Sequence, residues 1–216
     1  MSEQAKIAII YYSSTGHAYQ VAKAFEEGAK SAGAEVRLRR VQELAPQAAI
    51  AQNPQWKAHA DATSGVPVAT LDDLEWANGY VFGSPTRYGA VTAQLKQFID
   101  QAGPLWMQGK LANKPVTVFT GAGNPHGGQE NTILNIHSVM HHWGAVIVPP
   151  GYTDPVLYAA GGNPYGISYT AGQGSTLVEE TVLAAARYQG ARIARYASVI
   201  AANIGKLVPE KAAAQN

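Results

Sequence analysis

The chain has 216 residues, a length that suits one α/β domain or one domain with insertions. Its net charge of +1, from 16 Lys and Arg against 15 Asp and Glu, gives no electrostatic footprint for nucleic acid or for a membrane surface. The chain contains no cysteine, which excludes thiol catalysis, disulfides and cysteine-ligated metals. Charged residues make up 14% and hydrophobic residues 46%, so we expect either a large core or a surface buried against other subunits.

No targeting or membrane pattern is visible in the sequence. Residues 1–6 lack a basic stretch followed by an apolar one, the pattern of a secretion signal. No apolar run approaches ~20 residues, the length of a transmembrane helix. We therefore expect a cytoplasmic protein without membrane insertion.

The first elements are predicted by apolar spacing. Residues 6–12 are apolar on both faces, which is typical of a central parallel strand. A helix is predicted next, with one of the hydroxyl side chains at 13–15 as its N-cap and Gly33 at its end. A second strand is expected at residues 35–40. The helix stripe consists of Ala18, Val21, Ala22, Phe25, Ala29 and Ala32.

The next part of the chain is less regular. Residues 41–78 contain several prolines and weak periodicity, so we expect an excursion with one short helix near 71–75. Residues 80–83 predict a short buried strand. The helix that follows is predicted from the apolar stripe Leu95, Phe98, Ile99 and Ala102.

The second half continues the alternation of strand and helix. Strands are predicted at 116–120 and 145–148, and residues 151–175, rich in Gly and Tyr, are expected to form a long ordered loop. A long final helix is predicted across 178–200, and residues 209–216 are expected to be a disordered tail. The helix between the two strands is predicted from Ile133, Ile136, His137 and Met140.

This alternation predicts a flavodoxin-like α/β fold. We expect one domain over residues 1–208, with a doubly wound, five-stranded parallel sheet in the order 2-1-3-4-5 and insertions after strands 2 and 5. Ligands of such sheets bind beyond the carboxyl ends of the strands. The loops after strands 1, 3 and 4 have unusual compositions, so the sequence predicts a site where these loops meet.

The loop after the first strand reads SSTGH. A loop for a nucleoside triphosphate would need a lysine after its last glycine, and none is present. The hydroxyls of Ser13, Ser14 and Thr15, with free N–H groups at a helix start, can surround a monophosphate instead. Gly16 allows the close approach of the backbone. Ordinary helix capping is the alternative interpretation.

The other two loops are compatible with a flat ligand. The loop GAGNPHGG begins at Gly121 and has the spacing GxGxxxG, with no acidic residue ~20 positions on, which disfavours a dinucleotide site. Its glycines can still present backbone N–H groups to a planar ligand, or form a plain surface turn. In PTRYG, the cation of Arg87 and the ring of Tyr88 suit a flavin, although both also suit an ordinary surface loop.

The histidines were considered as metal ligands. His137 and His141 are four residues apart on one helix, but no glutamate lies between them in an HExxH pattern and no further ligand is evident. His137 belongs to the apolar stripe, so a packing role and no metal are predicted. His142 points away from that stripe, toward a cofactor or a neighbouring subunit.

Together, the stretches YYSSTGH, VFGSPTRYG, LKQFIDQAGPLW, GGQE, HHWGAVIVPPGY, GGNPYG and ARYQG resemble the WrbA family of NAD(P)H:quinone oxidoreductases. The resemblance runs from about residue 6 to residue 197. It implies a flavodoxin-like fold, one FMN per chain, and a homotetramer or a dimer. It also implies two-electron transfer from NADH or NADPH to quinones by a ping-pong mechanism, without semiquinone release.

The resemblance also implies site residues. Trp106 corresponds to a tryptophan on the substrate side of the flavin, and His142 to a flavin-contacting histidine. Thr15 replaces an aromatic residue that helps to hold the nucleotide in many members. The FMN-binding positions correspond to Ser13, Ser14, Thr15, Gly16, His17, Ala18, Thr86, Arg87, Tyr88, Gly121, Ala122, Gly123, Asn124, Pro125, His126 and Gly127.

Two further departures and three alternatives remain. The loop after strand 4 is one residue longer, and Trp143 stands where a second histidine is common. A one-electron flavodoxin carrier is the first alternative, which the neutral net charge disfavours. The others are a regulatory binding protein and an FMN-dependent reductase of azo compounds, nitro compounds or iron chelates.

Overall fold

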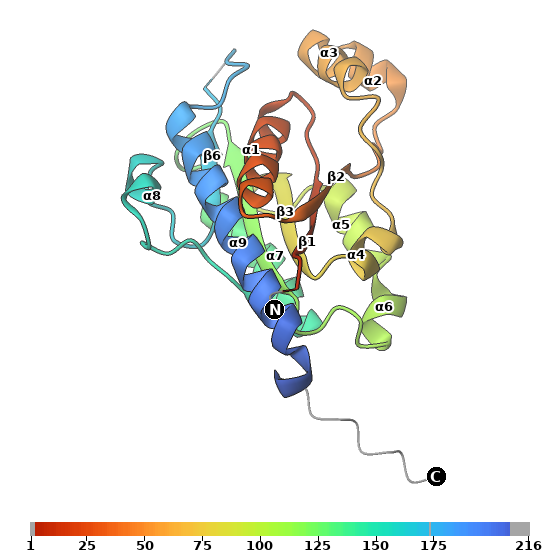
Figure 1. Ribbon diagram of the computed structural model, residues 1–216. Helices are drawn as coiled ribbons and strands as arrows, with labels where there is room; N and C mark the ends of the chain where they lie inside the picture. Colours follow the sequence, from red (N-terminus) through yellow and green to blue (C-terminus); the bar gives the residue numbers. More distant parts are fainter. Residues whose placement is uncertain (1–2, 173, 208–216) are drawn as a thin grey trace.

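The computed structural model describes residues 3–172 and 174–207, which form a parallel sheet between two layers of helices (Figure 1). The sheet order β2-β1-β3-β4-β5 confirms the predicted order, and β6 also pairs with β4. The predicted tail lies outside the described residues. The strands are β1 Lys6–Tyr11, β2 Glu35–Arg40, β3 Gly79–Pro85, β4 Pro115–Ala122, β5 Val146–Ile147 and β6 Ile167–Thr170.

The fifth position of the sheet is split between two strands. β5 pairs with the start of β4, at Pro115 and Val116, whereas β6 pairs with its end, from Phe119 to Ala122. The segment between them contains the short helix α8 (Pro155–Ala159). The prediction of five strands with a long loop over 151–175 was therefore wrong in this part. The insertion interrupts the fifth strand rather than following it.

Two helical layers cover the sheet (Figure 1). The helices α1 (His17–Ser31), α8 and α9 (Glu180–Leu207) pack on one face, and α4 (Leu71–Trp76), α5 (Ala93–Asp100), α6 (Gly103–Met107) and α7 (Gln129–Trp143) pack on the other. This arrangement explains why the central strands are apolar on both faces. Within the described ranges, no helix combines the length and hydropathy needed to cross a membrane.

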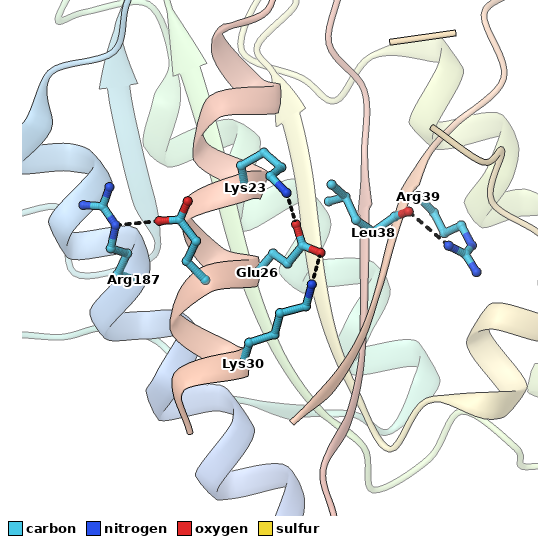
Figure 2. A network of polar contacts seen from close by, with 7 residues as sticks. Lys23, Glu26, Lys30, Leu38, Arg39 and Arg187 are labelled. Carbon is cyan, nitrogen blue, oxygen red and sulfur yellow. Dashed lines mark hydrogen bonds and ion pairs between the residues drawn. The ribbon is translucent and has the colours of Figure 1, made fainter. Parts of the chain in front are cut away.

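Helices α1 and α9 touch through two glycines. A Cβ at Gly28 would lie 1.9 Å from the Arg187 carbonyl oxygen, and one at Gly190 would lie 2.4 Å from the Phe25 carbonyl oxygen. Neither position can hold a side chain unless the helices separate. An ion pair also joins the two helices, from Arg187 of α9 to Glu27 of α1 at 2.8 Å (Figure 2). This close contact holds α1 in place on the sheet and therefore positions its first turn.

The insertion after β2 lies beyond the carboxyl ends of the strands (Figure 1). It contains α2 (Gln47–Ala51) and α3 (Pro54–Ala62), neither of which was predicted. Asn53 caps α3 by accepting a hydrogen bond from the Trp56 N–H. None of the α3 residues is fully buried, so the sequence contains no apolar stripe from which this helix could be predicted. The insertion brings α3 near the first turn of α1.

Candidate functional site

The turn after β1 is closed by its own backbone. Gly16 occupies the N-cap position of α1 in the left-handed region, with φ 99°, and no side chain caps the helix. The Gly16 N–H donates instead to the Ser13 hydroxyl at 3.1 Å. The prediction that a hydroxyl at 13–15 caps the helix was therefore wrong, because glycine takes the N-cap position and leaves the first turn open.

Several donors of this turn have no protein acceptor. The N–H groups of His17 and Ala18 belong to the first helical turn, which has no intrahelical partners to offer them. Among the described residues, the N–H groups of Ser14 and Thr15 also lack an acceptor. The part of the chain that the structure describes also provides no partner for the buried His17 Nε2 atom. The turn therefore presents a set of unsatisfied donors, which suits an anion such as a phosphate monoester.

Tyr169 of β6 packs against the turn after β1. Its ring stacks on His17 with centroids 6.0 Å apart, and a Cβ at Gly121 would lie 2.0 Å from the same ring. Burial raises the pKa of Tyr169 above its usual value, while the charge of Arg87 acts in the opposite direction. Tyr169 was missed at the sequence level. The alternation in ISYT was the available signal, but it lies in a Gly- and Tyr-rich stretch.

The loops after β3 and β4 are bonded to each other and to α7. The Thr86 N–H donates to the Gly121 carbonyl at 2.8 Å, and the Gly89 N–H donates to the Thr86 hydroxyl at 3.1 Å. From α7, Thr132 donates to the Thr86 hydroxyl, and Asn131 donates to the Gly89 carbonyl. The two loops therefore form one rigid platform.

Arg87 and Tyr88 project from this platform. Tyr88 has a positive φ of 54°, which is unusual for a residue other than glycine, and its ring is fully exposed. Arg87 is also exposed, and its guanidinium donates only to the neighbouring Thr86 carbonyl among the described residues. A flat face and an unpaired cation are thus available at the carboxyl edge of β3. Strained loop residues of this kind are frequent at binding sites.

Asn124 closes the loop after β4. Its side chain accepts from the His126 N–H at 3.0 Å, and its carbonyl accepts from the Gly127 N–H at 3.2 Å. A Cβ at Gly127 would lie 2.2 Å from the Ala122 Cβ, so glycine is required for the chain to turn back. The exposed part of the loop consists of Gly123, Asn124, Pro125 and His126.

Trp106 and His142 lie at the opposite edge of the sheet. The Trp106 indole donates to the His142 carbonyl at 2.8 Å, and the nearby Gly144 carbonyl accepts from Asn113, just before β4 begins. β4 has eight residues, which at ~3.3 Å per residue separate its two ends by roughly 23 Å. Within one chain, the structure therefore does not bring Trp106 and His142 together with the three loops.

His137 faces the interior of the molecule. Its side chain is buried, and burial, together with the neighbouring His141, lowers the pKa of His137 to about 4. A neutral, buried imidazole agrees with a packing position on α7. No group of three or more metal-ligating side chains occurs among residues 3–172 and 174–207.

The residues at the carboxyl edge fit a flavin mononucleotide. A turn with unsatisfied donors and no lysine follows β1, and a rigid platform with a flat ring and a cation follows β3 and β4. In a parallel sheet of order 2-1-3-4-5, this arrangement defines the flavodoxin-like class of FMN-binding proteins. The family described as NADPH-dependent FMN reductase matches residues 5–154, and the chain belongs to this family.

Curated relatives agree with this assignment and confirm the resemblance seen in the sequence. An NAD(P)H dehydrogenase (quinone) of Deinococcus radiodurans is 51% identical over 179 residues, covering 83% of this chain and 89% of the relative. One from Sinorhizobium fredii is 44% identical over 202 residues, covering 91% of this chain and 99% of the relative.

Solved structures support the fold. A WrbA-like flavodoxin from Agrobacterium tumefaciens superimposes with a TM-score of 0.65 at 21% identity, covering 90% of this chain and 98% of the other. Oxidised Flavodoxin 2 from Bacillus cereus gives a TM-score of 0.56 at 16% identity, covering 88% and 98%. At these identities the structures establish the fold alone.

Proposed function

We propose that the protein is an FMN-dependent oxidoreductase that transfers two electrons from NADH or NADPH to a quinone. The relatives named NAD(P)H dehydrogenase (quinone) support the activity, since they extend over most of the chain. The observation that carries the proposal is the lysine-free turn after β1 beside the Arg87 and Tyr88 platform. When bound, FMN supplies the redox chemistry, accepting hydride from the nucleotide and passing it to the quinone.

The residues of the three loops would hold and orient the cofactor. The hydroxyls and N–H groups of Ser13, Ser14 and Thr15, with the first turn of α1, would surround the phosphate. Arg87 would face the pyrimidine end of the ring, where a cation favours the negative charge of the reduced form. Tyr88 and the Gly121–Gly127 loop would flank the ring.

A ping-pong mechanism is part of this proposal, with one face of the ring open to both substrates. If the nucleotide and the quinone occupy the same side of the ring in turn, the first must leave before the second enters. The quinone would then take up a proton from solvent and leave as quinol, with no release of a one-electron product. The cytoplasm, which contains NADH and NADPH, is the compartment in which we place this activity.

We further propose that the active assembly is a homotetramer. Trp106 and His142 lie at the far edge of their own chain, so a second chain is needed for either to reach a flavin. Trp106 is 50% exposed and the adjacent Met107 is 82% exposed, which is consistent with a surface covered in an assembly. Trp106 would then line the substrate side of the flavin bound to a neighbouring chain.

The test is spectroscopic. The purified protein should be yellow, bleach with NADH or NADPH in the absence of air, and recover its colour on addition of benzoquinone. Steady-state rates at several nucleotide and quinone concentrations should give the parallel double-reciprocal lines of a ping-pong reaction. A colourless protein that does not bind added FMN would contradict the proposal.

A further inference from the structure

His59 of the insertion helix α3 lies against the turn after β1. Its Nδ1 atom would be 3.4 Å from a Cβ at Gly16, so the imidazole contacts the residue that closes the turn. Its ring is 5.7 Å from the ring of Tyr19 in α1. His59 is far from the turn in sequence, and only the path of the insertion brings it there.

Hydrogen bonds fix α3 in this position. The Gln55 side chain donates to the Ser175 carbonyl at 3.3 Å, which ties α3 to the segment before α9. Gln20 of α1 bonds the same segment twice, at the Thr176 carbonyl and the Val178 N–H. α1 and α3 are therefore held by a common segment on both sides of the turn.

The surroundings of His59 disfavour a charge in the absence of a ligand. Burial lowers the pKa of His59, and the nearby His17 lowers it further. A cavity of about 180 Å³ beside the turn is bounded by Ser13, Arg40, Glu43, Trp56 and His59, which gives solvent access to the imidazole.

The other charged and titratable groups of this region do not neutralise an imidazolium. Glu43 bounds the same cavity, but its carboxylate accepts hydrogen bonds from Tyr12, Gln94 and two backbone N–H groups, and the pKa of His59 is lowered by burial and His17 rather than raised by this carboxylate. Arg40, on β2, donates from its Nε to the Val66 carbonyl, burial raises the pKa of Tyr11, and the ring of Tyr19 lies beside the imidazole. On α3 itself, Lys57 and Asp61 form an ion pair at 2.6 Å, so they compensate each other.

We propose that His59 is a positioning residue for the phosphate of FMN, and that it takes up a proton from solvent when the phosphate enters the turn. This inference rests on the proposed function, since it requires FMN at the turn after β1. A dianion beside the Gly16 backbone would place negative charge next to the imidazole and so favour its protonated form. The proton binds to the imidazole ring and no covalent bond is made or broken.

The consequence is a pH dependence specific to the phosphate. A rise of one unit in the pKa of an imidazole on binding corresponds to a gain of up to about tenfold in affinity at low pH. Riboflavin has the same ring without the phosphate, so its affinity should not show this gain. The second ionisation of free FMN, near pH ~6, is the same for all variants and cancels in their comparison.

The experiment measures FMN and riboflavin dissociation constants by quenching of flavin fluorescence at pH 6, 7 and 8. It compares the wild type with His59→Gln and with His141→Gln, a control at an exposed histidine on α7. We expect the FMN affinity of the wild type relative to His59→Gln to rise about three- to tenfold from pH 8 to pH 6. The ratio of the FMN affinities of the wild type and His141→Gln should not change with pH. The corresponding ratios of riboflavin affinities should not change either.

Proton uptake provides a second measurement on the unmodified protein. Titration calorimetry of FMN at pH 7 in two buffers of different ionisation enthalpy should show more proton uptake than titration of riboflavin. Equal uptake with both ligands, or an FMN ratio for His59→Gln that does not change with pH, would overturn the role of His59. Absence of FMN binding at every pH would instead refute the proposed function, so the two failures are distinguishable.

Discussion

The Trp106 indole donates a 2.8 Å hydrogen bond to the His142 carbonyl, which joins α6 to the end of α7 at the amino-terminal edge of the sheet. The turn after β1 and the Arg87 platform lie at the other edge. A single chain therefore separates the two groups of residues that the resemblance to WrbA proteins assigns to one flavin. A site shared between chains reconciles the resemblance with the geometry.

Mixed assemblies should reveal this sharing. Trp106→Ala should remove the side chain that lines the neighbouring chain's site, while the turn after β1 of the same chain stays intact. Gly16→Ala should disrupt the turn after β1 of its own chain, while Trp106 stays intact. Each variant alone should show little quinone reductase activity when added FMN is kept below the dissociation constant of the Gly16→Ala subunit. Subunits mixed in equal amounts, with FMN added, should recover about a quarter of the wild-type activity, because random pairing gives each site both intact parts in one case out of four.

The control is the same pair of variants assembled separately and combined immediately before the assay. Subunit exchange has not occurred in that sample, so its activity should equal the mean of the two variants. Recovery no greater than this control would show that Trp106 does not complete a neighbouring site.

A second prediction concerns the glycine that closes the turn. Gly16 has φ 99° and Gly33, at the other end of the same helix, has φ 83°. Alanine at either position should lower the free energy of unfolding by about 1–2 kcal/mol, because a side chain is strained in the left-handed region. Only Gly16→Ala adds a Cβ near His59, since a Cβ at Gly33 meets nothing within 4 Å.

The two variants should therefore differ in FMN binding. We expect Gly16→Ala to weaken FMN at least about tenfold, a loss of ~1.4 kcal/mol, while Gly33→Ala binds FMN as the wild type does. Urea unfolding and flavin fluorescence measure the two quantities. Equal FMN affinities in the two variants would mean that the turn after β1 does not hold the cofactor.

Elements with a clear local pattern of apolar residues were predictable from the sequence. The strand at 35–40 was predicted with the bounds it has in the structure, and the one at 6–12 to within a residue. Helix α1 was predicted from its apolar stripe and its terminal Gly33. β1 is buried at nearly every position and α1 along one face, whereas β2 is a partly exposed edge strand, so the local apolar pattern identifies the first two more directly than the third.

Elements of the insertions were not predictable in the same way. α3 buries none of its residues completely, and β6 has four residues whose role depends on pairing with β4, more than 40 positions earlier. Two residues beside the turn after β1, His59 and Tyr169, were missed for this reason. Their places depend on where an insertion folds back, which local sequence does not specify.

A third prediction tests the contact between α1 and α9. Alanine at Gly28 or Gly190 would overlap the backbone of the partner helix, at 1.9 Å and 2.4 Å respectively. Each variant should lose about 3 kcal/mol or more of unfolding free energy, since a packed backbone cannot yield as a flexible side chain does. Thermal or urea unfolding would measure the loss.

Gly205, near the end of α9, provides the matched control. Among the described residues, a Cβ there meets no atom within 4 Å, and the position is exposed. Gly205→Ala should therefore stabilise the helix by about 0.5–1 kcal/mol, because alanine has the higher helix propensity. A similar loss in all three variants would show that steric overlap is not the cause.

The last prediction concerns pH and the carboxylate of Glu43, which follows β2. Burial raises the pKa of Glu43, but hydrogen bonds from the Ala45 N–H, Gln94, Tyr12 and the Leu44 N–H outweigh burial and lower the pKa below its usual value. A group with a lowered pKa stabilises the folded state above its ordinary pKa, and this contribution is lost as pH falls through the lowered value. Burial and the hydrogen bond to Glu43 raise the pKa of Tyr12, so its phenol remains a donor throughout this range.

The wild type should therefore exceed Glu43→Gln in unfolding free energy at pH 7, and the difference should shrink as pH is lowered below about 4.5, near the ordinary pKa of glutamate. Urea unfolding at pH 7, 5 and 3.5 measures the difference. Glu35→Gln, at an exposed position on β2, is the control, and its difference from the wild type should change less over the same range. A difference for Glu43→Gln that is constant with pH would mean that the four donors stabilise the shape of the loop rather than the charge of the carboxylate.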